Sequence, residues 1–234
     1  MKLLLSLVLT CSCSRPAGPV LLAELDAPVG SAFADLVPAI RDAAVEADDA
    51  SSDAAAALSM VQRSGWRASP AIPSRMKPNP LKPRLLTIHH SAARNRPGQD
   101  DGQVLAGIQA YQVQVKHWGD LAYHYFVGPS GALYEGRSLR YAADTTTHYD
   151  PTGHITVCVL GNFEEEEPTR PAKKALVELV VALLQKHGLS PADVRLHREV
   201  AQTLCPGKTL REWWRGPSGP KVGERVRGPR LLLP

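Results

Sequence analysis

Two histidines and one cysteine that lie far apart in the sequence have the side chains best suited to bind a metal ion. His89 and His197 each follow a short apolar run, and Cys205 comes eight residues after His197 in a polar loop. Imidazole and thiolate are common zinc ligands, and three protein ligands with one open position are typical of catalytic zinc sites. The other candidates, Cys158 and His187, fall in a predicted core strand and at a predicted helix end. The pattern therefore predicts an open, catalytic zinc site rather than a closed structural one.

A competing zinc motif does not fit. The run His197-Arg198-Glu199 shares its H-x-E pattern with the zinc deaminases, in which P-C-x-x-C follows. Here the order is Cys205-Pro206, no second cysteine follows, and the gap is too short. The sequence also lacks a Gly-rich phosphate loop, H-E-x-x-H and G-x-S-x-G. These absences exclude the deaminases and several common hydrolase and nucleotide-binding classes.

The elements that would position these ligands form a mixed sheet. The sequence predicts strands over 85–88, 123–127, 132–135, 155–160 and 194–197, and helices over 104–118 and 172–184, ended by glycines 119 and 188. His89 and His90 follow the first strand, and adjacent strand residues point to opposite faces. One of them can therefore face a site while the other packs or hydrogen-bonds. The order of elements predicts an α/β domain with a mixed central sheet flanked by helices.

The helix over 104–118 is predicted to bury one apolar stripe. Apolar residues recur in it at spacings of three and four, which places them on one face of a helix. The stripe consists of Val104, Ile108, Tyr111, Val115 and Trp118. We expect this face to pack on the sheet.

Length and composition indicate one soluble domain with tails. The chain has 234 residues, 44% hydrophobic and 21% charged, with a net charge of +4. We expect an acidic, alanine-rich linker over 19–57, a catalytic domain over 58–215 and a basic, disordered tail over 216–234. No aromatic residues are interleaved with the basic charges of the tail. This favours a solvated tail over a nucleic-acid-binding one.

The N-terminus is typical of an exported protein. Lys2 precedes the apolar run 3–9, which is too short to cross a bilayer as a mature helix and fits a signal peptide over 1–18. Cys11 follows this run, as the lipidated cysteine does in bacterial lipoproteins, although Thr10 stands where Gly, Ala or Ser is usual. The sequence therefore predicts export, either secreted or as a periplasmic or outer-membrane lipoprotein, and leaves membrane attachment through Cys11 open.

The remaining cysteines allow two interpretations. Cys158 lies inside the apolar run 155–160, where a buried free thiol is the ordinary explanation. A disulfide between Cys158 and Cys205 in an oxidising compartment stays open as the alternative.

Five blocks of the sequence resemble one known family. They are Ile88-His89-His90-Ser91-Ala92, Tyr123-His124-Tyr125-Phe126, Leu133-Tyr134-Glu135-Gly136-Arg137, the run 155–163, and His197-Arg198-Glu199-Val200 through Thr203 to Cys205-Pro206-Gly207. In this order and with these gaps they are similar to the zinc-dependent N-acetylmuramoyl-L-alanine amidases, a family that includes bacteriophage T7 lysozyme and the peptidoglycan recognition proteins. The resemblance covers roughly residues 60–215.

The resemblance implies a site and a reaction. It implies one zinc ion per chain, held by His89, His197 and Cys205. The family's catalytic tyrosine matches Tyr123, and its second polar catalytic residue matches Thr203. The reaction would be hydrolysis of the amide bond between N-acetylmuramic acid and L-alanine, in peptidoglycan or a muropeptide, by a monomeric enzyme. Members that only bind peptidoglycan commonly lack the cysteine, so Cys205 favours an enzyme.

The sequence also departs from the family pattern. Many members carry a Gly-x-His segment where this chain has 142–147, with Thr146 at the aligned position and His148 as a candidate replacement. The pair Ser138-Leu139 stands where related proteins distinguish stem peptides, so no stem preference is implied. The altered segment motivates the alternative of a non-catalytic peptidoglycan-binding module.

Other polar residues are expected to have structural roles. We expect His124 to be buried and hydrogen-bonded, and Glu135 and Arg137 to line the site or to pair with each other. Surface positions are expected for His117, His148, His154 and His187.

Overall fold

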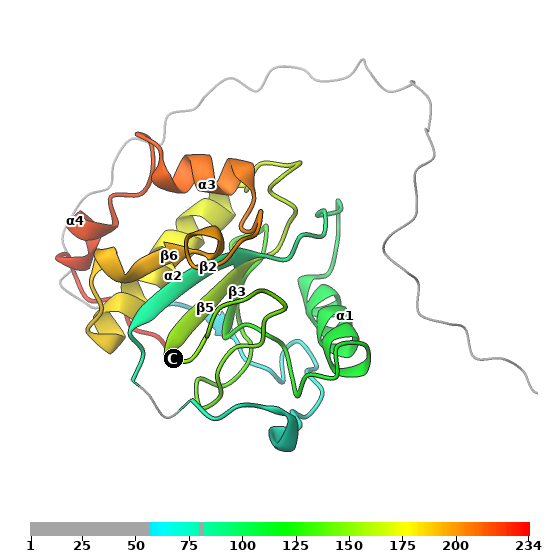
Figure 1. The fold of residues 1–234 in the computed structure, drawn as a ribbon. Coiled ribbons are helices and arrows are strands. Elements are labelled where there is room, and N and C mark those ends of the chain that lie inside the picture. Colours follow the sequence, from blue (N-terminus) through cyan, green and yellow to red (C-terminus); the bar gives the residue numbers. More distant parts are fainter. Residues whose placement is uncertain (1–56, 80–81) are drawn as a thin grey trace, which may run out of the picture. The chain divides into compact units, whose positions relative to one another are not determined.

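The computed structural model describes residues 57–79 and 82–234. Within them, six strands form one sheet in the order β1-β4-β3-β5-β2-β6 (Figure 1). The strands are β1 (Met60–Val61), β2 (Leu85–His90), β3 (Tyr125–Val127), β4 (Leu133–Glu135), β5 (His154–Val159) and β6 (Val194–Leu196). β3 and β4 pair antiparallel, and the other pairs are parallel. This confirms the predicted α/β fold with a mixed sheet.

The centre of the sheet brings the ends of β2 and β6 to one edge. β2 pairs with β5 along its whole length, from Leu85 with His154 to His90 with Val159. On its other side β2 pairs with β6, where Ile88 lies opposite Leu196. Because neighbouring parallel strands end at the same edge, the residues that end β2 and follow β6 must lie close together.

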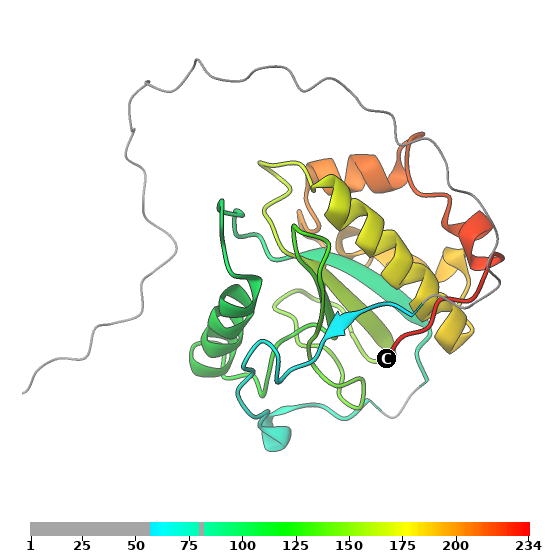
Figure 2. The ribbon, with the colours of Figure 1, turned by 180° about the vertical axis from the view of Figure 1, so that it is seen from behind.

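α2 (Arg170–His187) covers one face of the sheet (Figure 2). It begins after Thr169, whose hydroxyl accepts a hydrogen bond from the Ala172 N–H, and ends at Gly188 in the left-handed conformation. Each fully buried aliphatic side chain in this layer stabilises the fold by about 1.5–3 kcal/mol. The sheet residues in the same core are Leu86, Ile88, Ile155, Val157, Val159, Val194 and Leu196. The helix, with its stop at Gly188, agrees with the prediction from periodicity.

α1 (Asp101–Gln114) confirms the predicted apolar stripe only in part, since Val104 and Ile108 are partly buried and pack against the core cluster that contains Leu105. Tyr111 and Val115, which were expected in the core, are 51% and 55% exposed. The buried face instead carries Leu105 together with two amides, Gln109 and Gln112. The helix also begins and ends earlier than the predicted range of 104–118.

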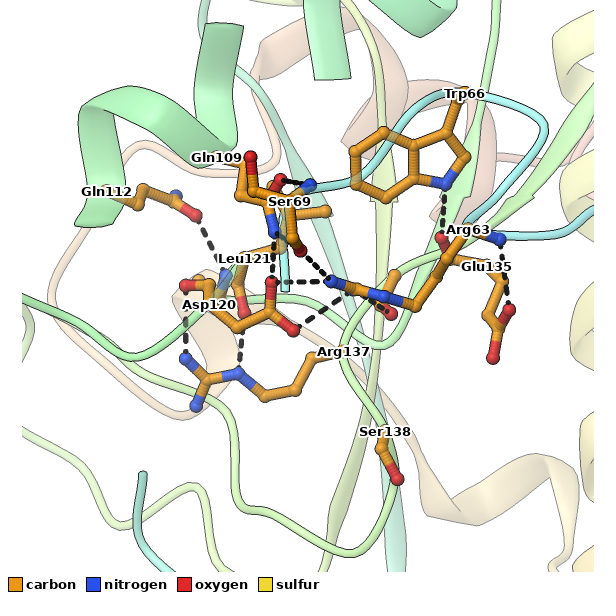
Figure 3. A network of polar contacts seen from close by, with 12 residues as sticks. Arg63, Trp66, Ser69, Gln109, Gln112, Asp120, Leu121, Glu135, Arg137 and Ser138 are labelled. Atoms are coloured by element: carbon orange, nitrogen blue, oxygen red, sulfur yellow. Dashed lines mark hydrogen bonds and ion pairs between the residues drawn. The ribbon is translucent and has the colours of Figure 1, made fainter. Parts of the chain in front are cut away.

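The amides of α1 can be buried because each has a hydrogen-bond partner (Figure 3). Gln109 Nε2 donates to Asp120 Oδ1 at 2.7 Å, and Gln112 Oε1 accepts from the Ala122 N–H at 2.8 Å. Asp120 is itself 2% exposed and pairs with Arg63 at 3.0 Å. Polar side chains can be buried in a folded protein when each of them has a hydrogen-bond partner. Hydrogen bonds therefore attach α1 to the loop 120–122.

The C-terminal segment differs from the expected disordered tail. Residues 216–234 include α4 (Val222–Val226), and Val222 is buried in the core next to α2. Gln185 of α2 donates to the Val226 carbonyl at 3.1 Å and accepts from the Leu231 N–H at 2.9 Å. A few apolar residues anchor the segment to the domain. The prediction of disorder was wrong because it considered the many basic residues and not these apolar ones.

The predicted signal peptide over 1–18, and the linker over 19–57 up to residue 56, lie outside the described residues. The predicted domain over 58–215 contains all six strands. It also contains α3 (Lys208–Arg215), a helix that the sequence analysis did not predict. None of the helices in the described part of the chain is long and apolar enough to cross a membrane.

Candidate metal centre

The structure brings the three candidate metal ligands together at one edge of the sheet. His89 lies near the end of β2, His197 directly follows β6, and Cys205 lies in the loop before α3. Their candidate ligand atoms all lie within 4.8 Å of one another. His89 Nδ1 is 3.7 Å from Cys205 Sγ. A nitrogen and a sulfur that bind one tetrahedral zinc ion lie about 3.6 Å apart, so this separation fits a shared ion.

One ring nitrogen of each histidine in this cluster lacks the hydrogen-bond partner that a buried polar atom normally has. His89 Nε2 and His197 Nδ1 are buried without a hydrogen-bond partner among the described residues. Because buried polar side chains are nearly always hydrogen-bonded, the unpartnered Nδ1 of His197 indicates that this cluster is built to bind a ligand. Two imidazoles and a thiol form a donor set that suits Zn²⁺. The residues present therefore fit the metal that the family resemblance implies.

The electrostatics of the cluster also suit a cation. Burial lowers the pKa of His89 well below 6.5, nearby His197 lowers it further, and burial lowers the pKa of His197 to about 4. Both imidazoles are therefore neutral at neutral pH, as a metal ligand must be. Burial raises the pKa of the Cys205 thiol to about 12, although the His90 N–H donates to its sulfur at 3.4 Å. Deprotonation of this thiol and binding of a cation are therefore coupled.

The two candidate catalytic residues contact different members of the cluster. The Tyr123 ring centroid is 4.8 Å from that of His89, and Tyr123 precedes β3 instead of lying within the strand as expected. Burial raises the pKa of Tyr123 well above 10.0, so its hydroxyl keeps its hydrogen and can donate. Thr203 Oγ1 accepts a hydrogen bond from the Cys205 N–H at 3.2 Å. The structure thus brings Tyr123 to His89 and Thr203 to the backbone of Cys205.

Gly207 fixes the path of the loop that carries Cys205. Its φ is +95°, a conformation that residues with a side chain rarely adopt. A Cβ atom at this position would lie 2.4 Å from the backbone carbonyl carbon of Phe163. Thr209 then donates its N–H to the Phe163 carbonyl at 2.9 Å. The loop therefore packs closely against the segment after β5.

Replacing Gly207 by alanine is expected to weaken both the fold and zinc binding. The strained backbone and the contact with Phe163 would cost about 1–3 kcal/mol, and relief of that contact would displace Cys205. Gly188→Ala is the matched control, because Gly188 has a φ of +67° but a Cβ there would meet no heavy atom within 4 Å. We expect thermal unfolding to show a loss of stability in both variants, and competitive zinc titration to show a loss of affinity only in Gly207→Ala. Equal zinc affinity in the two variants would contradict the positioning role of Gly207.

Two residues that the sequence analysis missed contact His197. Thr147 Oγ1 lies 2.9 Å from His197 Nε2, and the Tyr149 ring centroid is 5.3 Å from that of His197. Both lie in or beside the segment that departs from the family pattern, and this departure was the only signal in the sequence. Thr146 and His148, the positions that the sequence analysis emphasised, are exposed.

Glu135 and Arg137 are not paired with each other. The Glu135 carboxylate accepts the Arg63 N–H at 3.1 Å. Arg137 is 1% exposed, donates to the Leu121 carbonyl at 2.5 Å and forms an ion pair with Asp144. These interactions correct the expectation that the two residues pair with each other, and they make Arg137 a buried link between loops.

The other histidines are divided between core and surface. As predicted, His124 is buried, with Nδ1 accepting the Thr156 N–H at 3.0 Å. His154 was expected at the surface but is 4% exposed, because it begins β5 and its Nδ1 lies 2.8 Å from Thr87 Oγ1. His117 and His148 are exposed, and His187 is partly exposed.

Both cysteines among the described residues are free thiols. Cys158 is buried on β5 and Cys205 lies in the ligand cluster. The open alternative of a disulfide between them is therefore not realised.

Several known proteins are similar to this chain in sequence and in fold. A model of the family described as N-acetylmuramoyl-L-alanine amidase matches residues 79–208. The N-acetylmuramoyl-L-alanine amidase of Sus scrofa is 32% identical over 147 residues, which are 60% of this chain and 24% of the pig protein. Peptidoglycan recognition protein 1 of Mus musculus is 32% identical over 154 residues, which are 64% of this chain and 83% of the mouse protein. The structure of human PGRP-IBETAC in complex with glycosamyl muramyl pentapeptide is 25% identical, with a TM-score of 0.58, covering 67% of this chain and 96% of that chain.

These matches include an enzyme and a recognition protein. This chain spans about a quarter of the length of the pig amidase but most of the mouse protein. The family model covers more than half of the chain and includes His89, His197 and Cys205. With the mixed sheet and the ligand cluster described above, this coverage places the chain in the N-acetylmuramoyl-L-alanine amidase family.

Proposed function

We propose that this protein is a zinc-dependent hydrolase that cleaves the amide bond between N-acetylmuramic acid and L-alanine in peptidoglycan. The observation that carries the proposal is the buried cluster of His89, His197 and Cys205, in which Nδ1 of His197 has no hydrogen-bond partner among the described residues. Among the described residues no fourth histidine, cysteine or carboxylate joins this group. Three protein ligands leave a coordination position for water or substrate, which is the arrangement of catalytic zinc sites. Membership in the amidase family supports the choice of bond.

The reaction divides between the metal and the side chains around it. A bound zinc ion supplies Lewis-acid chemistry here, because it lowers the pKa of water and polarises the amide carbonyl. Tyr123, protonated and next to His89, donates a hydrogen bond to the carbonyl oxygen as negative charge develops on it. Thr203 accepts the Cys205 N–H and keeps its own hydroxyl hydrogen as a second donor. The carbon–nitrogen bond breaks to give a lactyl carboxylate and the free amine of L-alanine.

A non-catalytic recognition module is the second candidate. It is supported by the mouse relative, a peptidoglycan recognition protein, and by the human structure bound to a muramyl pentapeptide. The altered segment 142–147 also favours it, since it lacks the Gly-x-His pattern that many family members have. Against it stands Cys205, which completes a three-ligand cluster that recognition alone does not require.

Product analysis of a defined muropeptide tests the proposal. We expect the zinc-loaded protein to release a stem peptide with a free N-terminal L-alanine, identified by mass spectrometry. A chelator should abolish the reaction, and added zinc should restore it. Binding of the muropeptide without release of the stem peptide would favour the recognition module. Cleavage at a glycosidic or peptide–peptide bond would contradict the assigned bond.

We also propose that the protein acts outside the cytoplasm, as a monomer. The apolar N-terminal run behind Lys2 supports export, either as a secreted protein or as a lipoprotein modified at Cys11. An exported hydrolase of this class would meet wall peptidoglycan or released muropeptides and not nucleic acid.

A further inference from the structure

We propose that Thr147, acting with Thr145, is a positioning residue that selects the tautomer of His197 and thereby sets the zinc affinity of the cluster. This inference rests on the zinc site of the proposed function. The two ring nitrogens of His197 have different surroundings. Nε2 lies 2.9 Å from Thr147 Oγ1, whereas Nδ1 is buried without a hydrogen-bond partner among the described residues.

Hydrogen bonds link the two threonines to His197. Thr145 Oγ1 accepts the backbone N–H of Thr147 at 3.0 Å and lies 2.7 Å from Thr147 Oγ1. A hydroxyl has one hydrogen and two acceptor lone pairs, so Thr145 can accept both bonds. The Thr147 hydroxyl then donates to Thr145, and its oxygen is left to accept a hydrogen from His197 Nε2. This arrangement gives every bond in the chain one donor and one acceptor.

The direction of these hydrogen bonds decides which nitrogen of His197 has a lone pair. With the hydrogen on Nε2, the lone pair lies on Nδ1, and Nδ1 can bind a metal ion. In the reverse arrangement the Thr147 hydroxyl donates to Nε2, and a hydrogen is placed on the buried, unpartnered Nδ1. A buried Nδ1 without a partner is unfavourable in either tautomer, but only the tautomer with its hydrogen on Nε2 lets a bound cation satisfy it. The hydroxyl chain therefore favours the tautomer that is competent to bind zinc.

The segment that carries the two threonines is fixed to the interior of the domain. Asp144, which precedes Thr145, forms an ion pair with the buried Arg137. The Arg137 guanidinium also donates to the Ala142 carbonyl at 2.6 Å and to the Leu121 carbonyl at 2.5 Å, and Figure 3 shows it beside Leu121. Its backbone N–H donates to the Tyr123 carbonyl at 2.9 Å. One buried arginine thus links the threonine segment to the loop that presents Tyr123.

The His197 ring packs against two neighbouring rings. The ring centroid of His197 lies 4.3 Å from that of His89 and 5.3 Å from that of Tyr149. Hydrogen bonds from such outer residues commonly change metal affinity by about 10–100-fold.

Three variants test the role of Thr147. Thr147→Val removes the hydroxyl at nearly constant volume, Thr147→Ser retains it, and Thr146→Val makes the same change at the exposed neighbouring residue. Competition with a chromophoric chelator would measure the Kd for zinc, and ¹⁵N NMR of the metal-free protein would identify the His197 tautomer. We expect Thr147→Val to raise the Kd about 10–100-fold and to lose the pure Nε2–H tautomer, while the other two variants resemble wild type.

The outcomes separate this inference from the proposed function. A wild-type Kd and tautomer in Thr147→Val would overturn the positioning role, as would equal loss of zinc affinity in Thr147→Val and Thr147→Ser. If Thr147→Val does not fold, Thr145→Val supplies the same readouts, because it removes the acceptor of the Thr147 hydroxyl. Wild-type protein that binds zinc as expected, yet releases no stem peptide, would refute the hydrolase and leave the role of Thr147 intact.

Discussion

Replacing Cys205 by serine is expected to lower the rate of muropeptide hydrolysis by on the order of a thousand-fold or more, together with loss of bound zinc. Serine is close to cysteine in size, so the loop before α3 should keep its path. Cysteine binds zinc as a thiolate, whereas the serine hydroxyl does not ionise at neutral pH and is a poor replacement. Only the neutral His89 and His197 would then face the cation, and the anionic ligand that balances its charge would be lost.

The same substitution at the other described cysteine is the matched control. Cys158 is free and fully buried, but it belongs to the core of the sheet and not to the ligand cluster. Cys158→Ser should therefore lose some stability while retaining one zinc ion per chain and its hydrolytic rate. Metal content by atomic absorption and product release by mass spectrometry would be measured on both variants. Full zinc content in Cys205→Ser would refute the ligand assignment.

Replacing Tyr123 by phenylalanine is expected to reduce kcat by about 10²–10³-fold, the usual cost of losing one donor to a developing oxyanion. The change removes one hydroxyl group and leaves the ring that lies 4.8 Å from His89. Zinc content and thermal stability should therefore remain near wild type. The effect should appear in kcat more than in KM, because the hydrogen bond strengthens as charge develops on the carbonyl oxygen.

Tyr125 provides the control for the loss of a tyrosine hydroxyl. It lies two residues further along the chain, in β3, and packs against the core cluster next to α2. Tyr123 instead packs with the cluster that contains Trp66 and Phe126. Tyr125→Phe should therefore leave kcat unchanged. If both variants lose activity equally, or if Tyr123→Phe is fully active, Tyr123 has no role as a donor in the reaction.

The grouping of His89, His197 and Cys205 could be predicted from the types of these residues and their positions in the sequence. Histidines that end two neighbouring apolar strands, followed by a cysteine in a polar loop, have few purely structural explanations. Parallel pairing of β2 with β6 then requires the ends of these strands to meet, as the structure shows for His89 and His197. Residue type and topology together were sufficient for this part of the site.

The buried face of α1 could not be predicted from periodicity. The stripe rule assumes that buried positions are apolar, whereas Gln109 and Gln112 are buried because Asp120 and Ala122 satisfy their amides. Those partners belong to a loop whose path depends on the whole fold. The contact of Thr147 with His197 was unpredictable for the same reason, because the two residues are 50 positions apart. Only the packed chain reveals such pairs.

The place of β2 in the sheet has a consequence for how the chain acquires its structure during synthesis. Both neighbours of β2, β5 and β6, come later in the chain, so β2 leaves the ribosome before it has any strand to pair with. β2 cannot pair with the whole of β5 until residue 159 has left the ribosome. It cannot pair with the whole of β6 until residue 196 has followed. Contacts between such distant segments form slowly. The strand at the centre of this domain therefore stays unpaired during much of its synthesis.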